Sequence, residues 1–509
     1  MPLPEHAAYQ NLLLTALREL AQDPDRRRVI AHLAPVILVL YHLDLTPAQP
    51  ILAAGYASSP RGGTPWAPLS VLRSRLLDGP RRTTCDHDRP PSQQQAARAR
   101  EPQPRKGRAV GTRDTDTASE KKRSKPSRSR KARRARREAQ KNKAHAHQIA
   151  QGVTDRLVQQ LQNARDQNNP NDLTERLGRI LLECAVIESA NRGLLGDVTA
   201  LIATGDGSPL PTAADGHGKR VCDCEKSTRC DCPRVYSDPD AAWGWDHYRE
   251  VYYFGYSFYE VSVTSEGRDL PLTIELNPAN ESDHTASVKA MDRLHKRLRS
   301  HEQPLRIDIF VADAGHDSLA EHRFHQSWLV RPVIPLANKA PATHPSRGEV
   351  SLSERGVPLC QAGIEMAPWG SAGHGATRRP LFLCPVGARK LARCPLAPDG
   401  EAGWSCRPEL KRGPAVTVSP EDDPRLFPQI PRNSDRYKEL YRMRSGTERS
   451  NSLKKGVYAL PGCRHRRASF WLIRLYLAAL LQHAKAWVAE EDARAFVARL
   501  LGETVEAAA

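Results

Sequence analysis

Apolar residues follow a helical spacing in the first part of the chain, with one long interruption. Leucines recur at helical intervals within residues 8–77, and residues 148–196 repeat the pattern. Residues 81–147 between them hold few large apolar side chains and are rich in Arg, Lys, Ser, Pro and Gln. Because such a segment cannot bury enough apolar surface to fold alone, it is predicted to be a disordered linker.

From residue 197 onward the apolar pattern becomes that of strands alternating with helices. A first short strand is predicted over residues 198–204, ending where Gly205-Asp206-Gly207-Ser208 turns the chain. Further strands are predicted at 251–263, 270–277, 306–312 and 330–336, and helices at 285–301 and 318–328. The resulting order, β-β-β-α-β-α-β, indicates an α/β domain.

The remaining third of the chain contains one irregular and two helical stretches. Residues 338–431 are rich in Pro, Gly and Cys and are predicted to be irregular or β-rich. Residues 435–455 have helix-forming composition, with Ser434 as the expected N-cap. The strongly apolar residues 469–488 are predicted to form a helix that packs on the sheet.

The charge of the chain favours an anionic partner. The 509 residues suffice for two or three domains, and their net charge is +18. Residues 121–143 carry thirteen Lys or Arg against the single acid Glu138, which is typical of an arm that binds the DNA backbone without sequence preference. A merely solubilising linker is the alternative. The apolar stretches are too short or too charged to span a bilayer, and no export signal is evident.

Four residues in the predicted helix at 435–455 share one face. Tyr441, Arg444, Glu448 and Lys455 lie three, four and seven residues apart, so at about 100° per residue they fall within a stripe of roughly 60°. The glutamate can bind a metal ion, the two cations can hold phosphates, and the ring can stack or hydrogen-bond. The stripe therefore suits a metal-bound phosphodiester, although a solvated charged helix is the simpler interpretation.

The pattern Tyr-x2-Arg-x3-Glu-x6-Lys resembles the glutamate signature of bacterial insertion-sequence transposases of the DDE class. The resemblance covers residues 197–488 well, including Ser237–Trp243 and the apolar C-terminal run, and residues 1–79 weakly. It implies an α/β protein with an RNase H-like catalytic core. A β-rich insertion would precede the glutamate helix, and an all-α N-terminal region and the basic linker would complete the chain.

The resemblance also implies a catalytic triad of two aspartates and a glutamate. Asp206-Gly-Ser is similar to the family's Asp-Gly-Thr, and Asp313-Ala-Gly-His is similar to its second-aspartate motif. With Glu448 they would hold two Mg²⁺ or Mn²⁺ ions roughly 3.5–4 Å apart, which suit hard oxygen ligands. Each aspartate alone could equally be a turn residue. Asp215, in a loop, and Asp283, at an expected N-cap, are rivals that look structural.

Several cations and aromatic residues are predicted to contact DNA. Arg444 and Lys455 would hold phosphates, and Tyr441 would stack, contact phosphate or pack in the core. Trp369 could enter a flipped-base site but is more simply an ordinary tryptophan. In the basic linker the DNA-binding candidates are Arg130, Lys131, Arg133 and Arg134.

The odd number of cysteines, eleven, favours reduced thiols or metal ligands over disulfides. The first group, in a C-x-C-x5-C-x-C arrangement, could hold a structural Zn²⁺ or be free thiols: Cys222, Cys224, Cys230 and Cys232. The second group is more loosely spaced: Cys360, Cys384, Cys394 and Cys406.

Together these features predict a transposase that cuts its element's ends and joins them to target DNA. The expected domains are 1–79 (DNA-end binding, shortened), 80–147 (linker), 148–196 (helical), 197–337 and 432–509 (catalytic core) and 338–431 (insertion). Double-stranded DNA would be the partner, a homodimer would form in the synaptic complex, and the location would be the bacterial cytoplasm at the nucleoid. The alternatives are a decayed copy that binds DNA without cutting it, and an RNase H-like nuclease.

Overall fold

The structure is a computed structural model, and it describes residues 5–48, 50, 172–220, 222, 234–302, 304–344, 350–373, 378–397, 410, 412–460, 463–489 and 491–502. All of them belong to one compact unit, formed by residues 1–80 and 150–509. The predicted linker with its DNA-binding candidates lies outside the described residues. So do Cys224, Cys230, Cys232 and Cys406.

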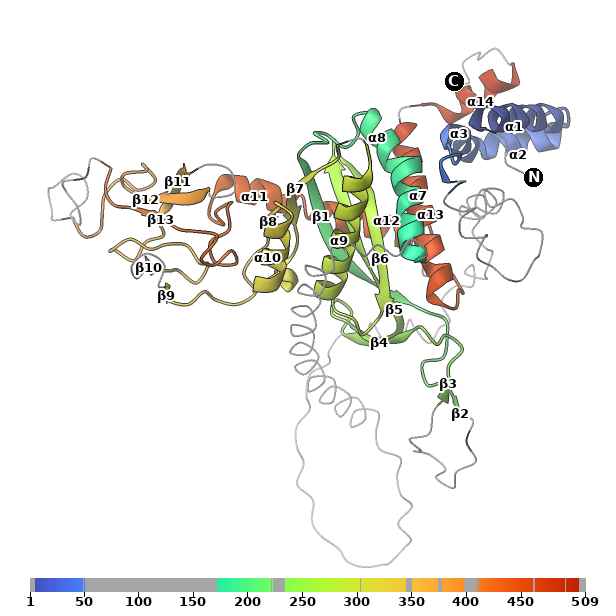
Figure 1. The fold of residues 1–509 in the computed structure, drawn as a ribbon. Coiled ribbons are helices and arrows are strands. Elements are labelled where there is room, and N and C mark those ends of the chain that lie inside the picture. Colours follow the sequence, from blue (N-terminus) through green and yellow to red (C-terminus); the bar gives the residue numbers. More distant parts are fainter. Residues whose placement is uncertain are drawn as a thin grey trace, which may run out of the picture. The chain divides into compact units, whose positions relative to one another are not determined.

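A mixed six-stranded sheet lies at the centre of this unit (Figure 1). The strand order is β4-β5-β1-β7-β8, and β6 pairs with β5 beside β4. β1 is antiparallel to β5 and parallel to β7, and β7 is parallel to β8. The strands are β1 (Leu201–Pro211), β4 (Ala242–Asp246), β5 (Val251–Ser265), β6 (Arg268–Pro278), β7 (Ile307–Val311) and β8 (Arg331–Val333). The prediction of an α/β domain is confirmed at this level.

The first strand continues beyond its predicted end. β1 runs on through Asp206 to Pro211 because β5 supplies backbone partners along this whole length. Gly205 is needed for close packing and not for a turn, since a Cβ there would lie 2.3 Å from the Tyr259 hydroxyl and 2.7 Å from the Phe310 ring. The placement of Asp206 at a strand end was therefore wrong.

One edge of β1 is open beyond its first four residues. β7 pairs with β1 only as far as Thr204 opposite Val311, so Asp206 and Gly207 have a neighbour on the β5 side alone. Side chains can reach this open edge from both faces of the sheet. Residues at the end of β7 can reach it as well.

Helices pack on both faces of the sheet (Figure 1). Alternation along β1 and β5 sends Asp206 and Glu260 toward α12 and sends Tyr259 toward α9. α13 packs on β6, where the Tyr476 hydroxyl donates to the Ile274 carbonyl at 2.8 Å, as the apolar pattern predicted. These helices are α9 (Asp283–Ser300), α12 (Ser445–Gly456) and α13 (Ala468–Trp487).

Three N-terminal helices pack with the last helix of the described chain. They are α1 (His6–Leu20), α2 (Pro24–His32) and α3 (Ala34–His42), and the last helix is α14 (Ala493–Leu501). The Tyr41 and Phe496 rings lie 5.2 Å apart, and His42 lies 3.4 Å from the Glu491 carboxylate. A further helix, α7 (Leu173–Leu181), continues through a π-helical turn (Leu182–Val186) into α8 (Ile187–Asn191) beside α13.

The segment between β8 and α11 (Asp435–Arg442) is β-rich and has its own apolar cluster. Its short strands are β9 (Thr343–His344), β10 (Val350–Ser351), β11 (Ala367–Ala372), β12 (Arg379–Leu383) and β13 (Ala415–Thr417). Leu352, Met366, Phe382 and Phe427 are among the side chains buried together here. Arg425 joins the segment to α10 (Leu319–Ser327) through Asp317, at 2.8 Å.

Candidate active site

Asp206 projects from β1 at the open edge, half-buried and opposite Glu260. Its carboxylate forms no hydrogen bond or ion pair within the part of the chain that the structure describes. Burial, together with the nearby carboxylates of Asp283, Asp313 and Glu448, raises the pKa of Asp206 to about 7. Negative charge is therefore concentrated around this residue.

Asp313 follows β7 and caps a short 3-10 turn, Ala314–His316. Its Oδ1 accepts hydrogen bonds from the Gly315 N–H at 2.9 Å and from His316 Nδ1 at 2.8 Å. Burial would raise the pKa of Asp313, but the hydrogen bond and charge of His316 outweigh it and lower that pKa below its usual value. Asp313 is therefore ionised, and its orientation is fixed.

Glu448 is held beside the sheet by the buried face of α12. The Thr447 hydroxyl lies 2.5 Å from that of Thr204 on β1 and 2.8 Å from that of Ser262 on β5. Two helical turns further on, Lys454 forms a fully buried ion pair with Glu260 at 2.5 Å. Glu448 itself is half-exposed and accepts an ion pair from Arg444 at 2.7 Å.

The four residues of the predicted stripe do not lie on one continuous helix. α11 ends at Arg442 and α12 begins at Ser445, because the N–H groups of Met443 and Arg444 bond three residues back. The tighter turn brings Gly446 against β5, where a Cβ would lie 1.9 Å from the Thr264 hydroxyl oxygen. The prediction of a single helix was wrong.

The break nevertheless keeps the charged members of the stripe near the carboxylates. Arg444 lies 5.9 Å from the centre of the Tyr441 ring. Burial would lower the pKa of Arg444, but the charges of Glu448, Tyr441, Asp206 and Asp313 raise it. Burial and the charge of Arg249 lower the pKa of Lys455, and they outweigh the charge of Asp206, which would raise it. Both cations thus lie within the field of the carboxylates.

Sequence reasoning misjudged one residue of this site. Asp283 is not an N-cap: Ser282 holds that position and accepts the Thr285 N–H, and Asp283 is the first residue of α9. The Ser-Asp pair was the available signal, since a serine is as good an N-cap as an aspartate. Asp215, by contrast, is the exposed turn residue that was expected, and accepts the His217 N–H at 3.0 Å.

The donor set fits a hard divalent cation. Asp313 and Glu448, from two further elements, lie near enough to Asp206 to raise its pKa, and carboxylate oxygens of this kind suit Mg²⁺ or Mn²⁺. Across the described ranges, no three His, Cys, Asp or Glu side chains stand close enough together to hold one ion. Glu448 in particular is turned to Arg444.

Residues 206–359 match the family model described as the transposase DDE domain. The chain carries a transposase DDE domain. The resemblance to DDE transposases of insertion sequences is thereby confirmed, and the matched range begins at Asp206 and includes Asp313. No curated protein matches the chain.

The DDE domain and the segments around it contain other features that the sequence singled out. Trp369 is exposed on β11, with the Arg412 guanidinium 5.6 Å from its ring. Cys384 and Cys394 are buried and Cys360 is half-buried, and these described members of the second cysteine group form no metal cluster. Of the first cysteine group only Cys222 is described. Among the described helices none is both long and apolar enough to cross a bilayer.

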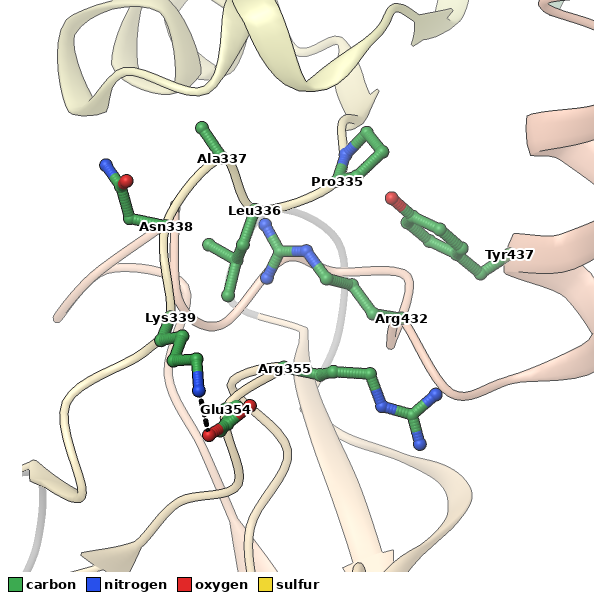
Figure 2. Close-up of a pocket in the computed structure, with 9 residues that line it drawn as sticks. All are labelled: Pro335, Leu336, Ala337, Asn338, Lys339, Glu354, Arg355, Arg432 and Tyr437. Atoms are coloured by element: carbon green, nitrogen blue, oxygen red, sulfur yellow. Dashed lines mark hydrogen bonds and ion pairs between the residues drawn. The ribbon is translucent and has the colours of Figure 1, made fainter. Parts of the chain in front are cut away.

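A cavity of about 420 Å³ lies where the DDE domain meets the start of α11 (Figure 2). Its charged groups are already engaged: Lys339 pairs with Glu354, and Arg432 donates to three backbone carbonyls. Tyr437 closes one side. Because none of the predicted catalytic residues lines it, the cavity is separate from the carboxylate site.

The buried imidazole of His316 should make the stability of the DDE domain depend on pH. Burial would lower the pKa of His316, but the carboxylates of Glu321, Asp313 and Asp283 raise it from the usual 6.5 to about 9. The charged ring thus stabilises the folded state fully below about pH 6.5, and this contribution is lost as the pH rises to about 9. We expect roughly 2–3 kcal/mol of unfolding free energy to be lost across that range.

Urea unfolding of the metal-free protein at pH 6.5, 7.5, 8.5 and 9.5 measures this loss, with His316→Gln as the reference. The wild-type curve should approach that of the variant as the pH rises. Two parallel curves would contradict the assigned charge of His316.

Proposed function

We propose that the protein is a transposase that nicks the ends of its element and joins the freed 3′-hydroxyl to target DNA. The transposase DDE domain at residues 206–359, which contains Asp206 and Asp313, carries the proposal. The carboxylates of Asp313 and Glu448 support it, because they lie near enough to Asp206 to raise its pKa. We further infer that the mixed sheet and its flanking helices are an RNase H-like core. The β-rich segment before α11 would be its insertion.

The three carboxylates would hold two Mg²⁺ or Mn²⁺ ions. Such ions activate a water or a 3′-hydroxyl and stabilise charge on the leaving oxygen. His316 keeps Asp313 ionised and oriented for this task, at 2.8 Å. To bind an ion, the half-exposed Glu448 would have to leave its ion pair with Arg444.

The cations beside the carboxylates would bind the DNA backbone. Arg444 can hold a phosphate with two parallel hydrogen bonds once it is released from Glu448. Lys455 acts as a point charge, and its lowered pKa reflects partial burial that a phosphate would compensate. Tyr441 supports Arg444 through its ring face and can also contact the strand.

The partners follow from the same proposal. Duplex DNA carrying the element's terminal inverted repeats would bind to the site, and the basic segment that includes Arg130, Lys131, Arg133 and Arg134 would add affinity that falls with salt. A homodimer would bring two ends together for joining. A transposase acts on DNA, so the protein would be located at the nucleoid in the bacterial cytoplasm.

The decisive test is a labelled duplex that spans one end of the protein's own gene, incubated with the purified protein and Mg²⁺. We expect a discrete nick at the terminus and, after addition of a target plasmid, joined products. Shifted complexes without any cut, with Mn²⁺ as well, would identify a decayed DNA-binding copy. Cutting without joining would identify a nuclease.

A further inference from the structure

Asp283 lies at the edge of the carboxylate site and is not the N-cap of its helix. Ser282 already caps α9, so the helix does not need the Asp283 carboxylate for its first N–H groups. The side chain is exposed, and within the described chain it forms no hydrogen bond or ion pair. An exposed carboxylate in this state remains available to a ligand.

The position of this carboxylate is fixed by a glycine next to Asp206. A Cβ on Gly207 would lie 2.1 Å from Oδ1 and 2.8 Å from Oδ2 of Asp283, so the carboxylate lies directly against the Gly207 backbone. Any other residue at position 207 would push Asp283 away. The structure thus brings a fourth carboxylate to the residue that follows Asp206 in the chain.

Asp206 and Asp283 reach the open edge of β1 from opposite faces of the sheet. Asp206 projects on the α12 side and Asp283 approaches from α9, while β7 ends before it can cover the edge between them. Asp283 is also the charged neighbour with the largest effect on Asp206, ahead of Asp313 and Glu448.

The other two carboxylates are already balanced by cations. Asp313 is paired with His316 at 2.8 Å and Glu448 with Arg444 at 2.7 Å. Asp206 and Asp283 form no direct ion pair among the described residues, although the charge of His316 acts on both. Their like charges face each other at one edge. A divalent cation would remove this repulsion, and carboxylate oxygens are its preferred ligands.

We propose that Asp283 is a fourth carboxylate ligand of the metal site and shares an ion with Asp206. This inference rests on the proposed metal-dependent function and adds a ligand that the three-carboxylate pattern lacks. It also explains why a glycine is required at position 207, since a side chain there would occupy the space of the ligand.

Binding of Mn²⁺, measured by the loss of its free electron paramagnetic resonance signal in titrations of the full chain, tests the proposal without DNA. Asp283→Asn should weaken the tightest Mn²⁺ site by at least about tenfold. Asp435→Asn is the matched control, because Asp435 follows the N-cap Ser434 as Asp283 follows Ser282. Asp435 is exposed and paired with Lys438, and the charges that shift its pKa are those of Lys438 and Lys390. Its Mn²⁺ binding should equal that of the wild type.

The melting temperature of the metal-free protein separates a ligand from a merely structural residue. If Asp283 is a ligand, Asp283→Asn removes repulsion and raises Tm, whereas a helix-stabilising role would make it lower Tm. Ser282→Ala should lower Tm through the lost cap and leave Mn²⁺ binding unchanged.

The outcomes distinguish this inference from the function on which it rests. Wild-type Mn²⁺ binding that Asp206→Asn abolishes and Asp283→Asn leaves intact would overturn the fourth ligand and keep the metal-dependent function. A wild-type protein that binds no Mn²⁺ would overturn both. Weakened binding in Asp283→Asn together with a raised metal-free Tm would support both.

Discussion

Asp206→Asn, Asp313→Asn and Glu448→Gln should each abolish the Mg²⁺-dependent terminal nick while the protein remains folded. Each change replaces a charged metal ligand by a neutral amide of the same shape. We expect cleavage to fall by at least about 10³-fold, which corresponds to roughly 4 kcal/mol of transition-state stabilisation. Gel analysis of the labelled terminal duplex, with single-turnover rates for each variant, measures the effect.

The three variants differ in what they should do to the metal-free fold. Asp206→Asn removes a carboxylate whose pKa is raised by burial and by the neighbouring carboxylates, so the variant should be at least as stable as the wild type near pH 8. Glu439→Gln, an exposed residue on α11, is the matched control for Glu448→Gln and should cut normally. Persistent cutting by Glu448→Gln would show that the third carboxylate lies elsewhere.

Lys454→Met should lower the free energy of unfolding by about 3–5 kcal/mol. The Lys454 ammonium is fully buried and binds Glu260 at 2.5 Å, Ser450 at 2.9 Å and Gln482 at 3.0 Å. Removing it leaves the Glu260 carboxylate charged and unpaired inside the protein, which costs far more than an exposed pair would. Urea unfolding followed by circular dichroism gives the loss.

The neighbouring lysine provides the control for that change. The free energy of unfolding of Lys455→Met should lie within about 0.5 kcal/mol of the wild-type value, because Lys455 is only partly buried. The same variant should bind DNA more weakly. The double variant Glu260→Gln/Lys454→Met should recover most of the stability, since glutamine keeps the contact with Ser450 and carries no charge. A Lys454→Met protein as stable as Lys455→Met would contradict the buried pair.

The sequence predicted the structure well where the apolar residues of a segment followed a single strand or helix pattern. The run at 251–263 became β5 because its side chains are buried on both faces, and the apolar run at 469–488 became α13 on β6. The helix at 285–301 was predicted within two residues of α9. In each case the apolar pattern along the sequence identified the element.

The errors in prediction occurred where tertiary contacts overrule local signals. Gly205-Asp206-Gly207 reads as a turn, but the glycines make room for Tyr259, Phe310 and Asp283, which come from distant parts of the chain. The split between α11 and α12 brings Gly446 close to β5, a tertiary contact that a helical projection cannot show. His316 was missed for the same reason, since its hydroxyl partner Tyr259 lies 57 residues away.

The packing of the first helices against the last one has a consequence for synthesis on the ribosome. About 450 residues separate α3 from α14, and translation at about 5–20 residues per second needs roughly 20 to 90 seconds to cover them. Until then the face of Tyr41 and His42 that receives Phe496 remains exposed to solvent or to a chaperone. The helices made first are thus completed last, and a nascent chain that stalls before α14 leaves its amino-terminal bundle uncovered.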